Sequence, residues 1–458
     1  MNIEQSNPLS QLLGADLKVP VFSGEEKRYI NLDNAATTPS FQSVWDHLSK
    51  VMPWYGSVHR GSGLKSIIST KLFDKALESI RSFSDASIEN DVLIFGWNTT
   101  SCINHLERRL ELDQNSIVIT AQYEHSSNVL PWRKNAKVIE CNSSDDGTLD
   151  IHHLEELLRK NRVKLVAVAA ASNVTGLVTD VHSIARLAHS YGAEIFVDAA
   201  QLVAHRQLIR KAHDAIDHLD YVAYSGHKMY SPFGIGVLIA KKKIFQEGWP
   251  DSPGGGTIKL IDGAEIIWSD LPSRETGGTP NFHGIIALAE ACKTLKNIGF
   301  EKIKAHEHEL IEYARTQFAK NENVIIHRKL TMPNNHDSIA IFPFSLNGYH
   351  PSLIGAYLGT EKAIGVRAGH LCQFALIRHI LSVPEAERIK IRSQIKDGEN
   401  RNLYGVVRAS CGIGTTKEDI SSLAIALTDL KQNGPQANYS QNADGVFEPT
   451  NWMPTFPF

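Results

Sequence analysis

Seven short runs of apolar and β-branched residues recur between about residues 91 and 240, and segments of helical periodicity separate them. The runs are VLIF, SIVIT, AKVIE, VKLVAVAA, AEIFV, DYVAYS and GVLIA. Continuous apolar runs are typical of strands that are buried on both faces, and strands that alternate with helices form parallel sheets. The pattern therefore predicts an α/β domain whose mostly parallel, seven-stranded sheet is covered by helices on both faces. Reactive loops of such a sheet lie at the carboxyl ends of its strands.

The second half of the chain predicts a different arrangement. After the glycine-rich stretch at 253–257, helical spacing of apolar residues predicts one or two long helices between Asn281 and Ala319. Short strands then mix with helices, as expected for a smaller α/β domain, and the last two dozen residues predict an irregular tail on the surface or on a partner chain. We expect four parts: an N-terminal segment 1–30 packed on the small domain, a large domain 31–285, a small domain 286–431 and the tail 432–458.

Composition narrows the range of functions. The 458 residues are 42% hydrophobic, and 47 Lys and Arg face 50 Asp and Glu, so neither a nucleic acid nor an acidic membrane is expected as partner. No stretch approaches the roughly 20 apolar residues that cross a bilayer, and the first residues lack the pattern of a signal peptide. The five cysteines are scattered without CxxC pairs or metal-type spacing. We therefore expect a cytoplasmic protein without disulfides or a metal site, acting on a small substrate.

A lysine follows directly on one predicted strand, in the segment YVAYSGHKMYSPFG. Lysine amines form Schiff bases with carbonyl cofactors, and burial or a nearby cation makes the amine a better nucleophile or base. Lys228 would be held on a rigid edge, and Ser225 and His227 just before it are suited to bind a phosphate. Taken alone, the segment is a weak signal that favours an ordinary surface lysine after a strand.

Three further strand ends carry compatible chemistry. Asp198 is suited to pair with the pyridine nitrogen of pyridoxal phosphate and keep it protonated, although an acid there is also a common helix N-cap. Asn173 is suited to bind the phenolic oxygen of the cofactor or a substrate carboxylate, or only to form a turn. Thr99 and Thr100 begin a predicted helix, where free N–H groups favour a phosphate but threonines also serve as caps. Together, the four strand ends predict bound pyridoxal 5'-phosphate.

Ten segments, in order along the chain, carry a resemblance to a known family. They are YINLDNAATTP, YGSVHRGSG, NTTSCIN, EHSSNVLPW, SNVTG, VDAAQ, SGHK, GTPN, GVRAGHLC and VVRAS. From about Tyr29 to Ile420 the chain resembles the class V aminotransferase group of fold-type I pyridoxal phosphate enzymes. Within that group it most resembles the cysteine desulfurases and selenocysteine lyases. The resemblance implies a large cofactor-binding domain followed by a smaller α/β domain.

The resemblance also implies a role for each cofactor residue. Lys228 would carry the cofactor as a Schiff base, Asp198 would pair with the pyridine nitrogen, and Gln201 would contact the phenolic oxygen. His125, from EHSSN, would stack on the ring, although most histidines are structural. The implied phosphate ligands are Thr99, Thr100, Ser225 and His227, with Thr279 of GTPN serving the cofactor of a neighbouring subunit. A homodimer is therefore expected.

For the substrate, the resemblance implies recognition of an amino acid through its carboxylate. Arg408, in VVRAS, would form a bidentate pair with the α-carboxylate, a task that suits the planar guanidinium. Asn173 would be the second carboxylate or cofactor contact, and His59, Arg60 and Arg367 would line the substrate pocket.

Cys372, in GVRAGHLC, falls where desulfurases keep the cysteine that takes sulfur from L-cysteine. The thiolate is the reactive form, and Arg367 and His370 would favour it if they lie nearby. The implied reaction converts L-cysteine to L-alanine and leaves a persulfide on Cys372, which passes its sulfur to an acceptor protein or a small thiol. A buried, inert cysteine is the ordinary alternative. Other class V activities, such as a C–S lyase or an amino-acid epimerase, and a non-enzymatic scaffold also stay open.

Three features depart from the family pattern. Asn98 stands where a glycine often precedes the two threonines, and RETGGTPN has one extra residue before Thr-Pro-Asn. The segment 383–405 is longer than in the shorter desulfurases. We expect that it could cover the site and change the choice of substrate or sulfur acceptor.

Overall fold

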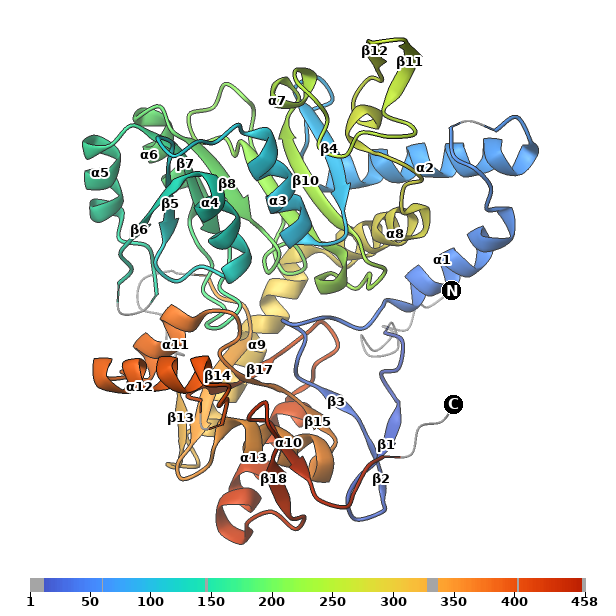
Figure 1. Ribbon diagram of the computed structural model, residues 1–458. Coiled ribbons are helices and arrows are strands. Elements are labelled where there is room, and N and C mark those ends of the chain that lie inside the picture. Colours follow the sequence, from blue (N-terminus) through green and yellow to red (C-terminus); the bar gives the residue numbers. More distant parts are fainter. Residues whose placement is uncertain (1–11, 60, 145–146, 328–336, 402, 455–458) are drawn as a thin grey trace. The chain divides into compact units, whose positions relative to one another are not determined.

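Figure 1 shows the chain as a computed structural model, which describes residues 12–59, 61–144, 147–327, 337–401 and 403–454. Contacts within the chain divide it into two compact units. The large unit comprises residues 37–172 and 178–303. The small unit comprises residues 1–36, 173–177 and 304–458 as far as they are described. Each unit has its own sheet and its own core.

All seven apolar runs of the sequence become strands of one sheet in the large unit. The strands are β4 (Asp91–Gly96), β5 (Ile117–Ala121), β6 (Lys137–Cys141), β7 (Val163–Ala169), β8 (Glu194–Asp198), β9 (Tyr221–Ser225) and β10 (Gly236–Lys241). Their order across the sheet is β4-β10-β9-β8-β7-β5-β6. Strands β5 to β9 pair in parallel, whereas β10 runs antiparallel to both β9 and β4. The predicted α/β class and the mostly parallel, seven-stranded sheet are confirmed.

Helices pack on both faces of this sheet. They are α1 (Gln42–Val51), α2 (Leu64–Phe83), α3 (Thr99–Arg109), α4 (Leu130–Asn135), α5 (Ile151–Lys160), α6 (Val181–Ser190), α7 (Lys243–Gln246) and α8 (Phe282–Ile298). On one face, Leu106 of α3 and Trp132 of α4 form a buried cluster with Tyr221 of β9. On the other, the Tyr224 hydroxyl lies 2.7 Å from Ser84 Oγ at the end of α2. Successive residues of a strand point to opposite faces of the sheet, so β9 contributes side chains to both layers.

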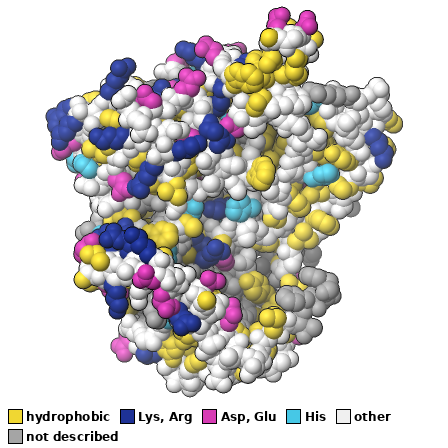
Figure 2. Space-filling view, in the orientation of Figure 1, with side chains coloured by type: hydrophobic (Ala, Val, Ile, Leu, Met, Phe, Trp, Pro, Cys, Tyr) yellow, Lys and Arg dark blue, Asp and Glu magenta, His cyan; other side chains and the backbone are white. Residues whose placement is uncertain are grey.

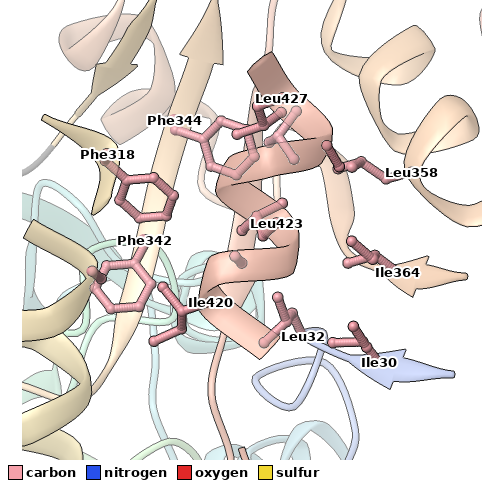
Figure 3. Close-up of a cluster of buried hydrophobic side chains, with 14 of the residues drawn as sticks. Ile30, Leu32, Phe318, Phe342, Phe344, Leu358, Ile364, Ile420, Leu423 and Leu427 are labelled. Atoms are coloured by element: carbon pink, nitrogen blue, oxygen red, sulfur yellow. The ribbon is translucent and has the colours of Figure 1, made fainter. Parts of the chain in front are cut away.

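The small unit is built on an antiparallel sheet of order β13-β14-β17-β16. Its strands are β13 (Val324–Ile326), β14 (Ile341–Leu346), β16 (Arg367–Gly369) and β17 (Val406–Ser410). Its helices are α9 (Phe300–Phe318), α10 (Pro351–Lys362), α11 (Phe374–Ile380), α12 (Glu385–Lys396) and α13 (Lys417–Asn433). Figure 3 shows the core, where Phe342 and Phe344 of β14 share a buried cluster with Leu423 and Leu427 of α13. The N-terminal part joins this unit, because β3 (Ile30–Asn31) pairs in parallel with β15 (Ile364–Gly365).

The helical pattern predicted after residue 281 becomes two helices, α8 and α9. Gly299, which ends α8, has φ 91°, a conformation that favours glycine and interrupts the helix. Within the described ranges, every helix is too short or too polar to cross a bilayer.

The two ends of the chain form small hairpins. The N-terminal one pairs β1 (Lys18–Pro20) with β2 (Glu26–Arg28). A third hairpin, away from both ends, pairs β11 (Ile258–Asp262) with β12 (Glu265–Trp268) in the large unit. The tail is more regular than its composition predicted, because β18 (Tyr439–Gln441) pairs with β19 (Phe447–Pro449). Asn442 Oδ1 accepts the N–H groups of Asp444 and Val446 and closes the turn. Asn and Gly in this stretch therefore form a turn between strands, a local bonding pattern that composition alone does not distinguish from an irregular segment.

Candidate active site

Lys228 ends a short 3-10 turn, η4 (Gly226–Lys228), which follows β9 directly. Gly226 N donates to the backbone oxygen of Ile235, the residue directly before β10, at 2.8 Å. A Cβ atom on Gly226 would lie 2.6 Å from Ile235 Cγ2 and 2.9 Å from Ser231 O, which is too close. The tight turn therefore needs glycine, and the lysine is held at the carboxyl end of a buried strand.

Residues Thr37 and Thr38 hold the turn that carries Lys228 through hydrogen bonds. The Thr38 N–H donates to His227 O at 2.9 Å, and the Thr37 and Thr38 hydroxyls donate to the same oxygen at 3.0 and 3.2 Å. Thr38 Oγ1 also accepts the Tyr230 N–H at 2.7 Å. Sequence reasoning did not assign these threonines, although they stand in the quoted motif YINLDNAATTP.

Asp198 ends β8 with a buried carboxylate. Within the described residues, this carboxylate accepts one hydrogen bond, from the Ala200 N–H at 3.0 Å. Burial raises the pKa of Asp198 above its ordinary value, whereas the Ala200 hydrogen bond and the positive charge of Lys228 lower it. A buried carboxylate that accepts so few hydrogen bonds is suited to pair with a positively charged group. It therefore fits the protonated pyridine nitrogen of pyridoxal phosphate. Gln201 is also buried, three residues further on.

Glu124, a residue that sequence reasoning missed, is a second buried carboxyl group near Asp198. Its oxygens accept hydrogen bonds from Asn128 Nδ2 at 2.9 Å and from Ala169 N at 2.8 Å. Burial, with a smaller contribution from the negative charge of Asp198, raises the pKa of Glu124 to about 8. Glu124 therefore stays mostly protonated near neutral pH and adds little negative charge beside Asp198. The available signal was its place in the motif EHSSN, directly before His125.

Three of the predicted phosphate ligands, Thr99, Thr100 and Ser225, lie at the first turn of α3. The Thr99 N–H donates to Ser225 Oγ at 2.7 Å, and the two hydroxyl oxygens lie 2.5 Å apart. The Thr100 hydroxyl lies 2.7 Å from that of Ser127, which sequence reasoning did not name. Asn98 is the N-cap of α3, since its side chain accepts the Ser101 N–H. Hydroxyl groups beside a helix N-terminus are the donors that a phosphate needs.

The two histidines of the predicted cofactor site have different surroundings. His125 is half-buried, and its Nδ1 accepts the Ser127 N–H at 3.1 Å, which leaves the proton of the neutral ring on Nε2. Burial and the charge of Lys228 lower the pKa of His227 to about 4. His227 is therefore a neutral hydrogen-bonding group at physiological pH.

In the small unit, Arg408 lies buried on β17 and already has partners. Its Nη2 donates to Asp33 Oδ1 at 2.8 Å, and its Nη1 donates to Asn173 O at 3.0 Å. Burial lowers the pKa of Arg408, whereas negative charge on Asp33 and on Cys372 raises it. Asp33, another residue that sequence reasoning missed, also has its Oδ2 3.8 Å from Arg367 Nη1. The two arginines are cross-strand partners on β17 and β16, so they flank the same carboxylate.

Cys372 is exposed on a turn that the Asn173 side chain holds, and its neighbours Leu371 and Gln373 are buried. The Asn173 side-chain amide donates to Leu371 O at 2.9 Å, and its Oδ1 has no hydrogen-bond partner among the described residues. Leu371 and Cys372 both adopt left-handed backbone conformations, with φ of 54° and 57°. Non-glycine residues rarely adopt this conformation, so two in succession make a strained turn.

His370 does not supply the positive charge that was expected beside Cys372. Its ring stacks on Phe374 at 4.6 Å and meets Tyr404 edge-on at 5.0 Å. Burial and the charge of Arg378 lower the pKa of His370, so it is neutral at physiological pH. The expectation for His370 was wrong because an imidazole packed between aromatic rings loses its hydration.

His59 and Thr279 line a separate pocket of the large unit. The pocket has a volume of about 490 Å³ and is formed by the segments around residues 57–59, 73–77 and 272–280. Neither Lys228 nor Asp198 lines it. Arg60, the neighbour of His59 in the sequence, lies outside the described residues.

Two groups of predicted site residues thus emerge, one in each unit. Comparison with known proteins shows what kind of enzyme carries them. A family model described as aminotransferase class-V matches residues 30–423. The chain belongs to the class V aminotransferase family. Enzymes of this family depend on pyridoxal phosphate, so the predicted cofactor is confirmed and the chain is a pyridoxal phosphate-dependent enzyme.

Two sequence relatives of this class V enzyme carry the same functional name. It is 32% identical over 415 residues to a probable cysteine desulfurase of Staphylococcus aureus (strain Mu50 / ATCC 700699), a match that covers 89% of this chain and 93% of the relative. A probable cysteine desulfurase of Halalkalibacterium halodurans is 31% identical over 414 residues, covering 88% of this chain and 93% of the relative.

Solved structures agree with these sequence relatives. A cysteine desulfurase from Thermococcus onnurineus NA1 matches with a TM-score of 0.75 and 27% identity, covering 88% of this chain and 94% of that chain. The cysteine desulfurase CsdA from Escherichia coli matches with a TM-score of 0.73 and 25% identity, covering 88% and 95%. The resemblance to cysteine desulfurases inferred from ten sequence segments is confirmed.

Proposed function

We propose that this class V enzyme is a cysteine desulfurase, which converts L-cysteine to L-alanine and receives the sulfur as a persulfide on Cys372. The observation that carries the proposal is the thiol itself. Of the five cysteines, all within the described ranges, Cys372 alone is exposed and the other four are buried. A thiol exposed on a strained turn, near a buried arginine, is suited to react rather than to pack.

The residues of the large unit would hold the cofactor. In this proposal Lys228 binds it through its amine, Asp198 pairs with the ring nitrogen, and His125 lies against the ring. The hydroxyl groups of Thr99, Thr100 and Ser225 at the start of α3 would bind its phosphate, with His227 as a neutral partner and Gln201 at the phenolic oxygen. When bound, pyridoxal phosphate supplies an electron sink for negative charge at the substrate Cα.

Substrate recognition would rest on Arg408. A guanidinium has five N–H donors, and Asp33 and Asn173 engage two of them. Three donors are left for the α-carboxylate of L-cysteine, and Asp33 keeps the buried guanidinium charged and correctly oriented. Asn173 would add a contact through its buried Oδ1, while Arg367 and His59 would line the route to the site.

Two of the enzyme's own groups would carry out the chemical steps. The Lys228 amine takes the proton from the substrate Cα, a role of general base. The Cys372 thiolate then attacks Sγ of L-cysteine, so that an S–S bond forms while the Cβ–Sγ bond breaks and its electron pair stays with the carbon skeleton. Protonation of that skeleton gives L-alanine. Cysteine plus thiol thus becomes alanine plus persulfide, and no external oxidant is needed.

Identification of the product tests the proposal. The enzyme loaded with pyridoxal phosphate and given L-cysteine with dithiothreitol should release L-alanine and sulfide in equal amounts. The Cys372→Ser variant should lose both products while keeping the absorbance of the bound cofactor. Pyruvate and ammonia as the main products would show a C–S lyase instead, and full alanine formation by Cys372→Ser would show that Cys372 has no part in the reaction.

The proposal includes a homodimer in a reducing compartment such as the cytoplasm. Thr279 is exposed and lines a pocket that does not include Lys228, as expected if it binds the phosphate of the cofactor in a second subunit. Five free cysteines and a persulfide intermediate both favour reducing surroundings.

A further inference from the structure

A groove of about 300 Å³ lies between α11 and α12 in the small unit. Its walls combine apolar and cationic side chains, among them Phe374 and Arg378 from α11, Arg392, Ile395 and Lys396 from α12, and Tyr404. None of these residues belongs to the cofactor or substrate groups described above. Most of its lining residues lie in the segment 383–405, which the sequence marked as longer than in the shorter desulfurases.

Helix α12 is anchored to the protein by very little apolar surface. Of its twelve residues only Ile391 is buried, whereas Ile389 and Ile395 are 50% and 45% exposed. Phe374, across the groove, is also 50% exposed. Helices of folded proteins are stabilised mainly by burying an apolar face, so exposed isoleucines on a weakly anchored helix indicate a surface that a partner covers.

The charged residues that line the groove are mostly cationic. Arg388, Arg392 and Lys396 recur every four residues and therefore lie on one face of α12, and Arg378 adds a fourth cation from α11. The only carboxylate among the lining residues is Glu385, which pairs with Arg388 at 2.5 Å. Among the described residues, no ion pair involves the other three cations. Figure 2 shows the Lys and Arg side chains gathered beside exposed hydrophobic ones at the left edge, over α12.

The groove is joined to the turn that carries Cys372. Gln373 N donates to His370 O at 2.9 Å and closes this turn around the exposed thiol. The His370 ring stacks on Phe374 and meets Tyr404 edge-on, and both of these aromatic residues line the groove. The groove wall therefore includes Phe374, two residues after Cys372 in the chain, and both of its aromatic residues contact the His370 ring at the start of the turn.

We propose that this groove is the docking surface for a protein that receives sulfur from Cys372, and that the docking segment of this protein is acidic with apolar side chains. The inference rests on the proposed function, because it needs a persulfide to be passed on. The four cations match carboxylates, the exposed isoleucines and Phe374 match apolar side chains, and a concave site beside the thiol suits a protein segment better than a flat membrane surface.

The transfer itself is a thiol exchange. The thiolate of the acceptor attacks the outer sulfur of the Cys372 persulfide, a new S–S bond forms on the acceptor, and the Cys372 thiolate leaves. Atoms and electrons balance without any further reactant. The docked segment raises the local concentration of the acceptor thiol at the turn, so docking increases the transfer rate without changing the chemistry.

Two synthetic peptides test the proposal. Both carry one cysteine and the same isoleucine and phenylalanine residues, but one has Asp and Glu where the other has Asn and Gln. Holoenzyme treated with L-cysteine should transfer sulfur to the acidic peptide about 10-fold faster at low salt, and added salt should remove the difference. The double variant Arg392→Glu/Lys396→Glu should lose the preference, whereas Lys390→Glu, the same charge reversal at a single position of α12 outside the groove lining, should keep it.

The outcomes separate the two proposals. If wild-type enzyme with dithiothreitol forms no alanine, the proposed desulfurase function fails. If alanine forms but both peptides react at equal rates, or the double variant keeps the preference, docking in the groove is refuted and desulfuration stands. Stronger inhibition of peptide transfer by vesicles containing phosphatidylglycerol, or by a single-stranded oligonucleotide, than by a cysteine-free acidic peptide would also refute it. Unchanged dithiothreitol-dependent activity in both variants verifies that they are folded.

Discussion

The turn that holds Lys228 and the turn that holds Cys372 are built in opposite ways. The lysine turn follows a buried strand, contains a glycine whose replacement would bring a Cβ atom too close to Ile235 and Ser231, and is held by three hydrogen bonds to His227 O. The cysteine turn exposes the thiol of Cys372, has two successive left-handed residues, and is held by the Asn173 amide and by the Gln373 N–H. A group that must hold a cofactor in one orientation is fixed rigidly. A group that must take sulfur from one molecule and deliver it to another is itself exposed, on a turn with a strained backbone.

The largest effect is expected at the rigid turn. Lys228→Ala should lower alanine formation by ~1,000-fold or more, because the variant lacks both the amine that binds the cofactor and the general base. Single-turnover alanine formation and cofactor retention on gel filtration measure the two losses. Lys228→Arg keeps the positive charge but should be equally inactive, and activity within a few-fold of wild type would remove Lys228 from the proposed mechanism.

Arg408→Lys should have the next largest effect. A lysine keeps the charge but not the planar set of donors, so KM for L-cysteine should rise by ~10- to 100-fold with a smaller change in kcat. Steady-state kinetics measure the split. Arg367→Lys, on the neighbouring strand with an exposed side chain, is the matched control and should change KM less. An equal effect of both substitutions would contradict the assignment of the carboxylate to Arg408.

A moderate effect is expected where Asn173 holds the cysteine turn. Asn173→Asp preserves the side-chain shape but removes the donor to Leu371 O, so persulfide formation should slow by about 10-fold, the effect of one buried hydrogen bond. Rapid-quench labelling of the Cys372 persulfide measures the rate, and the cofactor spectrum should stay unchanged. An unchanged rate would mean that the turn needs no anchor, and the contrast between the two turns would then be greater than proposed.

The last expected effect leaves catalysis aside and is a pH dependence of stability at Glu124, close to Asp198. Glu124 has a pKa of about 8 in the folded protein, against roughly 4.3 for a glutamate in an unfolded chain. Between these values the folded state binds more protons than the unfolded state, so the contribution of Glu124 to the free energy of unfolding falls as the pH rises. Compared with Glu124→Gln, the wild type should therefore lose stability between about pH 5 and about pH 8. Thermal unfolding at both pH values measures the difference, and parallel curves would show that Glu124 does not titrate in this range.

The sequence by itself determined the large sheet and the placement of its reactive residues. Strands buried on both faces of a parallel sheet must be continuously apolar, so all seven could be found as short runs between helical segments. Residues at the carboxyl ends of neighbouring strands must meet at one edge, which explains why Lys228 and Asp198 could be predicted together. In the small unit the pattern likewise predicted strands and helices, but not the hairpin of the tail.

Only the tertiary structure decided which residues support the predicted ones. Thr37 contacts His227 across 190 positions, Asn173 contacts Leu371 across 198, and Asp33 pairs with Arg408 across 375. The neutral state of His370 depends on two aromatic rings that surround it, and the raised pKa of Glu124 depends on burial by distant strands. Local periodicity records which face of a strand or helix is buried, because burial repeats every two or every three to four residues. Periodicity does not predict which distant side chain packs against that buried face, because this depends on the tertiary fold of the whole chain.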